Sequence, residues 1–413
     1  MKRESETIMS NKDKLAVFLC IGQSNITVIS TGNQELAVKP QEGTAFWDSL
    51  EDSTSLSVTG VKGLFGGFSD TFYKVTGEKC LMIQAALGGT SINNWQTSSD
   101  CLGAAINKYN AVLEELKKHK DKYEITRTGY LWLQGETDCR LGISPLDYSR
   151  KYLYMHETLN RECKKLHKND KKAFSFAGIL AVRSWSGRPN YMRPLNIVFG
   201  GPRAAQYAMG NLKTLTVDGI LHDTAEIRMI TNITENWYSD ESVVNWFSSD
   251  KIYYEQDRGV VKIVGRSEAD TDALMPPDIS SASIVPYPDQ HYLQKGYNEM
   301  GADAAKNLAN ILTIDTRPED IHVVLRAFNG IDFYRDGEET VITEETSTLV
   351  PCVTDLGINN YAFTYDFKSD TCPSAYVDQF GHISGLDNGA SGIYRVYLNG
   401  KEEPVLSAKI TMS

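Results

Sequence analysis

The sequence predicts an α/β fold built on a parallel sheet, followed by an all-β part. Two observations predict the α/β fold. Apolar strand-like runs alternate with amphipathic segments between residues 15 and about 312, and these runs are apolar at successive positions instead of every second one. The third observation is a change near residue 314, after which short apolar runs are separated by turn signals. A chain of 413 residues also exceeds what one core usually spans, so two domains are expected.

The strands and helices of the first domain follow from local patterns. Continuous apolar runs predict five strands, at 15–21, 80–87, 128–134, 174–182 and 214–217. Apolar residues spaced three and four apart predict helices near 103–120 and 294–312, and a further helix is expected around 201–210. Ser144 before Pro145 is typical of an N-cap followed by the first residue of a helix.

Residues from about 224 to 284 interrupt this alternation, and we expect an insertion near the edge of the active site. Within it, 251–264 predicts a hairpin around Asp257-Arg258-Gly259. The predicted layout is a polar segment at 1–14, an α/β domain at 15–313 with the insertion, and a β-sandwich at 314–413. Asn399-Gly400 suits a two-residue hairpin turn in that last part.

Composition excludes some classes of partner. The net charge of −11 argues against nucleic acid, because phosphate binding needs clustered Lys and Arg. No apolar run is long enough to predict membrane insertion, and no signal peptide is recognised. The seven cysteines form no close pair, so neither a zinc site nor any other metal is expected, although Cys352 and Cys372 would suit a disulfide in an oxidising compartment.

Four motifs carry chemistry, and each also has a structural interpretation. Gly22-Gln23-Ser24-Asn25 follows the first strand, where a serine serves either as a nucleophile or as a plain N-cap. Gly88-Gly89 follows the second strand and exposes backbone N–H groups, although a tight turn needs the same glycines.

The third motif is 132–138 at the end of another strand. There Gln134 offers an amide donor to a developing oxyanion, and Glu136 and Asp138 are acidic groups at the same edge; a capped loop is the alternative. The fourth is Asp289 and His291 before the last helix, an acid able to orient a general base, or else a surface loop. His222 is the rival histidine.

The order of these motifs resembles the SGNH hydrolase superfamily, specifically the branch of sialate O-acetylesterases and acetylxylan esterases. The likeness covers 15–312 without the insertion, and Arg203 and Gln206 match a helix motif of that branch. It implies a flavodoxin-like three-layer α/β/α sandwich and no cofactor. The stretch around Val377, Asp378 and Ile383 similarly resembles bacterial Ig-like group 2 domains, which implies an Ig-like C-terminal sandwich.

By this resemblance Ser24 is the nucleophile, His291 the general base and Asp289 its orienting acid. The N–H groups of Ser24 and Gly89 and the side chain of Gln134 would form the oxyanion hole. The family often has two residues between acid and histidine, whereas one stands here, so Glu136 is the alternative acid.

The resemblance implies a carbohydrate O-acetylesterase that acts on acetylated polysaccharide or oligosaccharide. A lipase-like or thioesterase activity is the competing enzyme class, and a glycan-binding or adhesive protein with an inactive hydrolase fold is the non-enzymatic alternative. An Ig-like part without a recognised signal favours a phage virion or an extracellular surface, with assembly through the C-terminal domain, and leaves the cytoplasm open. The sugar, the acetyl position and the oligomeric state are not encoded in any motif.

Overall fold

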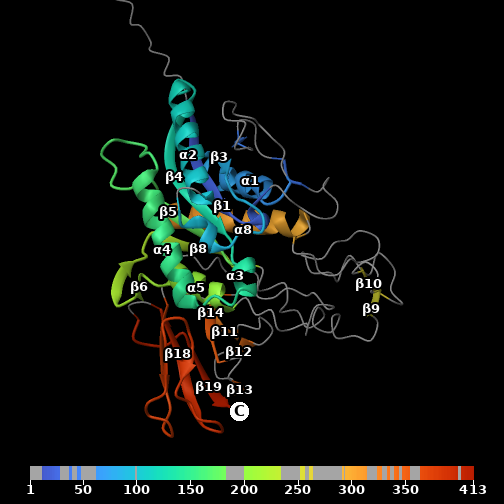
Figure 1. The fold of residues 1–413 in the computed structure, drawn as a ribbon, viewed down its shortest axis with the longest axis vertical. Coiled ribbons are helices and arrows are strands. Elements are labelled where there is room, and N and C mark those ends of the chain that lie inside the picture. The colour runs from blue at the N-terminus through green and yellow to red at the C-terminus, as the bar shows by residue number, and fades with distance from the viewer. Residues whose placement is uncertain are drawn as a thin grey trace, which may run out of the picture.

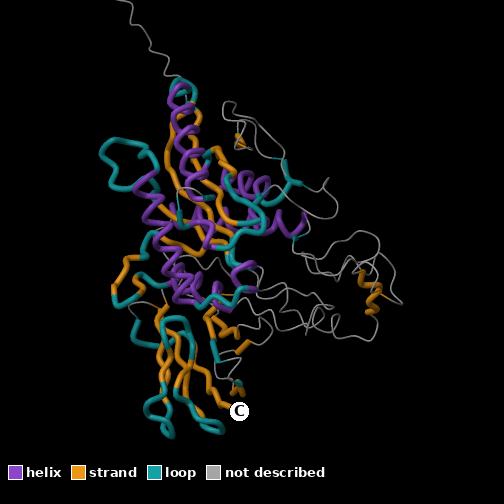
Figure 2. Tube along the Cα trace, viewed as in Figure 1, coloured by secondary structure: helices purple, strands orange, loops and turns teal. Residues whose placement is uncertain are grey.

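The computed structural model describes residues 12–27, 37–39, 44–47, 62–97, 100–182, 200–233, 252–255, 260–263, 291–292, 294–313, 323–327, 333–334, 339–343, 347–353, 363–398 and 401–413. Helices gather around the sheet of the N-terminal part, whereas the C-terminal part consists of strands and loops (Figures 1 and 2). These residues include no helix with the length and apolar character needed to cross a membrane.

The central sheet has six strands in the order β2-β3-β1-β4-β5-β8, and every neighbouring pair is parallel. Its strands are β1 (Asp13–Gly22), β2 (Ala45–Trp47), β3 (Lys79–Gln84), β4 (Tyr123–Leu133), β5 (Phe176–Leu180) and β8 (Ile227–Thr231). β1 lies in the middle and is buried from Leu15 to its end. The predicted parallel sheet is therefore confirmed.

Helices cover both faces of this sheet. α1 (Phe65–Thr76) and α8 (Gln294–Thr313) pack on one face, and the other carries α2 (Cys101–Lys118), α4 (Pro145–Glu162) and α5 (Gly200–Asn211). Successive side chains of β1 alternate between the faces, so that Phe18 meets α1 edge-to-face, with its ring centroid 5.3 Å from that of Phe68. Burial on both faces is the reason why the strand is apolar throughout.

Short helices follow the strands that carry the motifs. They are η1 (Ser24–Ile26) after β1, η3 (Ile92–Trp95) after β3 and α3 (Glu136–Arg140) after β4. The longer α4 begins as predicted, because the Ser144 hydroxyl accepts a hydrogen bond from the Asp147 N–H at 3.1 Å and Pro145 follows it.

The strand predicted at 214–217 is present, but its expected place in the central sheet is wrong, and one strand of that sheet lies where none was predicted. β6 (Thr214–Val217) is not a central strand but pairs antiparallel with β7 (Ile220–Asp223), because Asp218 and Gly219 both have positive φ and make a tight turn between them. The sheet instead takes β8, which lies inside the range 224–284 expected as an insertion. Alternate residues of β6 are exposed, whereas Met229 and Ile230 of β8 are buried, as a central strand requires.

The remainder of that range is described only at β9 (Ile252–Glu255) and β10 (Val260–Ile263), which pair antiparallel as the predicted hairpin does. Its turn, 256–259, lies outside the described residues.

The described residues of the C-terminal part form three small sheets and fit an all-β domain. The largest consists of β13 (Glu339–Ile342), β19 (Leu406–Met412), β18 (Ser391–Leu398) and β15 (Phe363–Lys368). The others are formed by β12 (Phe333–Tyr334), β11 (Val323–Ala327) and β14 (Leu349–Val353), and by β16 (Tyr376–Val377) with β17 (Ile383–Ser384). The predicted turn at Asn399-Gly400 lies outside the described residues, between the antiparallel β18 and β19. Cys372 is a buried free thiol, and the side chain of Cys352 lies outside the described residues.

Candidate active site

Three of the four motifs meet at the carboxyl edge of neighbouring strands. β3, β1 and β4 are adjacent and parallel, so the loops that follow them emerge side by side. The chain places β2 and β3 on one side of β1 and then crosses to β4 on the other, so the strand order reverses between β1 and β4. Ligands of open α/β sheets bind outside such a reversal point.

Ser24 stands at this point, directly after β1. Gly22 ends the strand with φ of +132°, and the Gln23 N–H donates to the Leu133 carbonyl at 3.0 Å, which ties the turn to the end of β4. Ser24 then begins η1 and is half-buried. A Cβ placed on Gly88 would lie 3.6 Å from the Cβ of Ser24, so the glycine loop passes directly beside the serine.

Two backbone donors accompany the serine hydroxyl. Gly89 is exposed, and its φ of +73° lies in the left-handed region that glycine adopts without strain. The loop is held by the Leu87 N–H, which donates to the Gly22 carbonyl at 3.1 Å, and by the Thr137 hydroxyl, which donates to the Gly89 carbonyl at 3.2 Å. Within the described part of the chain, the N–H groups of Ser24 and Gly89 donate no hydrogen bond.

Gln134 occupies a different environment from the one expected of an oxyanion donor. Its side chain is wholly buried. Its Nε2 donates to the Gln23 Oε1 at 3.3 Å, to the Thr90 carbonyl at 3.1 Å and to Asp138, while its Oε1 accepts from the Tyr148 hydroxyl at 2.8 Å. The amide thus joins the three loops to one another, and its donors already have protein acceptors.

Asp138 is the acidic centre of this network. Both its carboxylate oxygens accept from the Ile92 N–H, at 2.9 and 3.1 Å, and one accepts from Gln134. Burial raises the pKa of Asp138 to about 6, an effect that the hydrogen bonds from Gln134 and Ile92 partly offset. Asp138 therefore fixes the loop after β3 to α3.

Glu136 is the second buried acid and lies next to the nucleophile loop. The Asn25 side-chain amide donates to its Oε1 at 2.5 Å, and the Asn25 Oδ1 accepts from the Tyr297 hydroxyl at 2.7 Å. Glu136 is only 5% exposed, and its Oε2 is buried without a hydrogen bond among the described residues. These hydrogen bonds connect Glu136, through Asn25, to Tyr297 of helix α8.

His291 lies half-buried, three residues before α8. Its neighbour Tyr292 is buried, and the rings of Tyr292 and Tyr297 pack edge-to-face with centroids 5.2 Å apart. Because Tyr297 also holds Asn25, the start of α8 lies against the loop that carries Ser24. Asp289 lies outside the described residues. The rival His222 is on β7, outside the central sheet, with its Nδ1 3.6 Å from Glu157.

Some residues of the site were not assigned a role from the sequence. Gln23 accepts from the N–H groups of Gly135 and Thr137, each at 3.4 Å, so it clamps the start of α3. The Gln206 amide donates to the Gln134 carbonyl at 2.6 Å. Gln23 lies inside a recognised motif, which was a usable signal, whereas Tyr148 lies on a helical stripe that indicates core packing alone. Trp95 is buried and belongs to the core.

Comparisons with known proteins agree with this geometry over the N-terminal part. Residues 14–167 match the family model described as carbohydrate esterase, sialic acid-specific acetylesterase. The match contains Ser24, Gly89, Gln134 and Glu136, covers less than half of the chain, and ends well before His291. It supports a hydrolase of the esterase class, similar to the SGNH branch that the motifs resemble.

A solved structure and the curated proteins were also compared. The X-ray structure of a protein from Arabidopsis thaliana is 13% identical, covers 72% of this chain and 99% of its own, and has a TM-score of 0.38. No curated protein matches the chain.

Proposed function

We propose that the protein is a carbohydrate O-acetylesterase that removes acetyl groups from polysaccharide or oligosaccharide by a serine mechanism. The main support is that Ser24, the exposed Gly89 loop and the buried Glu136 lie together where the strand order of a parallel sheet reverses. The family match over 14–167 supports the same class of reaction, since that family is one of carbohydrate esterases. No sugar is specified by either observation.

In the proposed first step, the Ser24 oxygen attacks the acetyl carbonyl carbon while His291 takes the serine proton. The carbonyl oxygen gains negative charge, which the N–H groups of Ser24 and Gly89 stabilise, because neither is otherwise engaged within the described residues. The C–O bond to the sugar then breaks, and His291 returns the proton to the leaving alkoxide. Water, deprotonated by His291, next attacks the carbonyl carbon of the acetyl-enzyme. The bond from that carbon to the Ser24 oxygen breaks, acetate leaves, and His291 returns the proton to Ser24.

Gln134 was expected as a third oxyanion donor, but its side-chain amide is hydrogen-bonded within the loops of the site. Its amide would have to release Thr90 or Asp138 before it reached an oxyanion. We propose that its resting role is to hold the three loops at a fixed separation.

The third member of the triad is proposed to be Asp289 or Glu136. Glu136 is supported by burial and by a carboxylate oxygen without a hydrogen bond in the described chain, since such a group is stabilised by a cationic partner such as an imidazolium. Asp289 is supported by its place two residues before His291. Glu136→Gln and Asp289→Asn, assayed separately, decide between them, because the orienting acid is the one whose loss lowers kcat by orders of magnitude.

Acetate release from a panel of acetylated glycans tests the proposed function. We expect wild type to release acetate and Ser24→Ala to lose at least about 10³-fold of the rate. Ser384→Ala, a half-buried serine of β17, serves as the matched control and should retain full activity. Equal activity of wild type and Ser24→Ala would contradict the proposal. Glycan binding without any acetate release would favour the adhesive alternative.

We further propose that the C-terminal strands attach the enzyme to a phage virion or a cell surface through an Ig-like domain. The support is their strand-rich, all-β character. Fractionation of the producing culture tests this: recovery on particles or surfaces is expected, and recovery in soluble cell extract alone would contradict it.

A further inference from the structure

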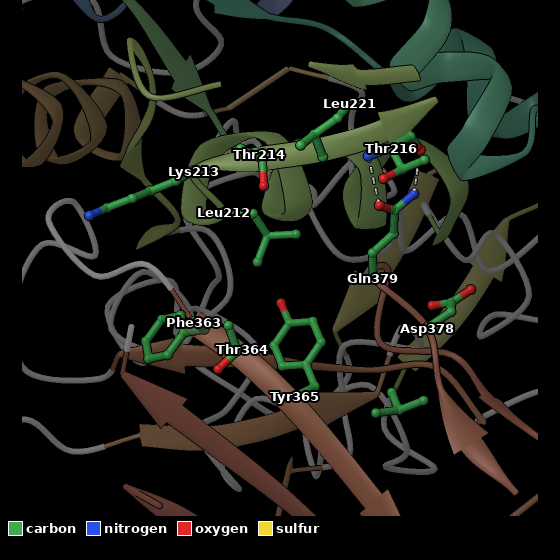
Figure 3. Close-up of a pocket in the computed structure, with 11 residues that line it drawn as sticks. Leu212, Lys213, Thr214, Thr216, Leu221, Phe363, Thr364, Tyr365, Asp378 and Gln379 are labelled. Carbon is green, nitrogen blue, oxygen red and sulfur yellow. Dashed lines mark hydrogen bonds between the residues drawn. The ribbon is translucent and has the colours of Figure 1, made fainter. Parts of the chain in front are cut away.

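A pocket lies far along the chain from the serine motif, where the β6–β7 hairpin faces the C-terminal strands (Figure 3). Its volume is about 340 Å³. One wall comes from the hairpin side and includes Lys213, Thr214 and Leu221, and the other from β15 and the segment after β16 and includes Tyr365 and Asp378. This volume falls within the range of about 300–1,000 Å³ that is typical of small-molecule sites.

The two walls are fastened together at one end of the pocket. The Thr216 N–H donates to the Gln379 Oε1 at 3.1 Å, and the Gln379 Nε2 donates to the Thr216 carbonyl at 2.8 Å (Figure 3). The amide thus pairs with the edge of β6 as a neighbouring strand would. Asp378 is fixed as well, because its Oδ1 accepts from the N–H groups of Phe380 and His382 at 2.8 and 2.9 Å. The pocket is therefore largely formed before a ligand arrives.

The lining combines two aromatic residues, Phe363 and Tyr365, with several hydrogen-bonding groups. Tyr365 rises from β15 with its hydroxyl directed into the pocket, below Leu212 and Thr214 (Figure 3). Threonine hydroxyls stand on both walls, at Thr214 and Thr364, and a hydroxyl both donates and accepts. A sugar matches both kinds of group, because its C–H faces pack on an aromatic ring and its hydroxyls need hydrogen-bond donors and acceptors.

We propose that this pocket binds a short neutral oligosaccharide segment. The charges of the lining favour a neutral ligand, because Lys213 and Asp378 have opposite signs and the whole chain carries −11. The proposal goes beyond acetyl removal: it needs no turnover, and it assigns to the junction of the two parts of the chain the task of holding a polymer while the enzyme works elsewhere on it.

Calorimetric titration of the full-length Ser24→Ala protein tests this, since that variant leaves the ligand intact. The probes are neutral, unacetylated xylo-, cello-, manno- and galacto-oligosaccharides. We expect at least one series to bind, and Tyr365→Ala to weaken that binding by about tenfold or more through loss of the ring. Tyr376→Ala is the matched control, because Tyr376 is a 56% exposed tyrosine of the same part of the chain and does not line the pocket.

A second variant guards against misfolding of the first. Thr214→Tyr places a bulky ring at an exposed strand position and should block the pocket without disturbing a core. Melting curves should match the parent for Thr214→Tyr. Absence of binding for every probe, or equal weakening by Tyr365→Ala and Tyr376→Ala, would overturn the proposal. Hydrolysis of a small aryl acetate should be unchanged when Tyr365→Ala is made in the protein that retains Ser24, which separates failure of this pocket from failure of the esterase site.

Discussion

Glu136, the first residue of the short helix α3, is a carboxylate in an unusual setting. Buried acids are normally neutralised by pairing or by protonation, yet one oxygen of Glu136 receives only the Asn25 amide, and the other has no hydrogen bond within the described ranges. Asn25 in turn is held by Tyr297 from α8. The position of Glu136 relative to Ser24 is therefore set by a residue that comes 272 positions after Asn25 in the chain.

Tyr297→Phe tests whether the hydrogen bonds that join Tyr297, Asn25 and Glu136 position the reacting groups. The change removes the donor to Asn25 and, if it removes about 1.4 kcal/mol of transition-state stabilisation, lowers kcat about tenfold with little change in KM. Tyr152→Phe is the control, because the Tyr152 hydroxyl accepts from Tyr130 at 3.0 Å on the other face of the sheet. Both variants should lose similar stability. An equal loss of kcat in the two would show that Tyr297 acts through stability alone.

Asp138→Asn tests the raised pKa of the Asp138 carboxyl group. The folded-state pKa of about 6 is above the unfolded value of roughly 3.9, so the native protein binds more protons between these values. The stability contributed by Asp138 is therefore fully present below about pH 4 and falls as the pH rises through 6. Asn does not titrate, so the free energy of unfolding of the variant should improve relative to wild type by roughly 2–3 kcal/mol from pH 4 to pH 7. Denaturant unfolding of both proteins across this range measures the difference, and a constant difference would contradict the raised pKa.

At the residue scale the sequence predicted the groups that stand in motifs, and little of what holds them. Ser24 and Gly89 were proposed as site residues because each lies in a short motif directly after a buried strand. The partnership of Asn25 with Tyr297 was hidden, since tyrosine on an apolar helical stripe indicates only core packing. The surroundings of Gln134 were also hidden, because a motif names a side chain but not the acceptors that its amide has already engaged.

At the scale of elements, the apolar pattern identified β1, β3, β4 and β5 because each is buried on both faces. The same pattern wrongly placed β6 in the central sheet. Its four residues are rich in β-branched side chains, which are typical of any strand and do not indicate the partner strand. β8 was missed since it follows that hairpin without an intervening helix, which breaks the strand–helix rhythm on which the prediction relied.

Gly22→Ala tests whether the end of β1 depends on close approach to β4. A Cβ at Gly22 would lie 2.1 Å from the Leu133 carbonyl oxygen, and φ is +132°, so both sterics and backbone oppose alanine. We expect a loss of more than about 3 kcal/mol in the free energy of unfolding, or failure to fold. Gly77→Ala is the matched control, since Gly77 also has positive φ but a Cβ there meets nothing within 4 Å. Its expected cost is about 1 kcal/mol. Similar losses in the two variants would contradict this account of the β1 turn.

At the scale of the whole molecule, the change of pattern near residue 314 predicted strands for the rest of the chain, and the residues described after α8 lie in strands and loops. The contact between this part of the chain and the α/β part was not predictable, because the side-chain amide of Gln379 bonds to the main-chain N–H and carbonyl of Thr216, groups that almost every residue carries. The pocket beside this contact arises only when both parts are present, so no single segment encodes it.

The central claim is that Ser24 is an activated nucleophile at the reversal point of the sheet, and covalent labelling tests it most directly. The intact protein is treated with a fluorophosphonate ester, and the adduct is located by mass spectrometry of peptides. The account predicts one adduct, on Ser24, whose formation is prevented by His291→Ala. A protein that remains unlabelled at Ser24, or labels on another serine, would contradict it.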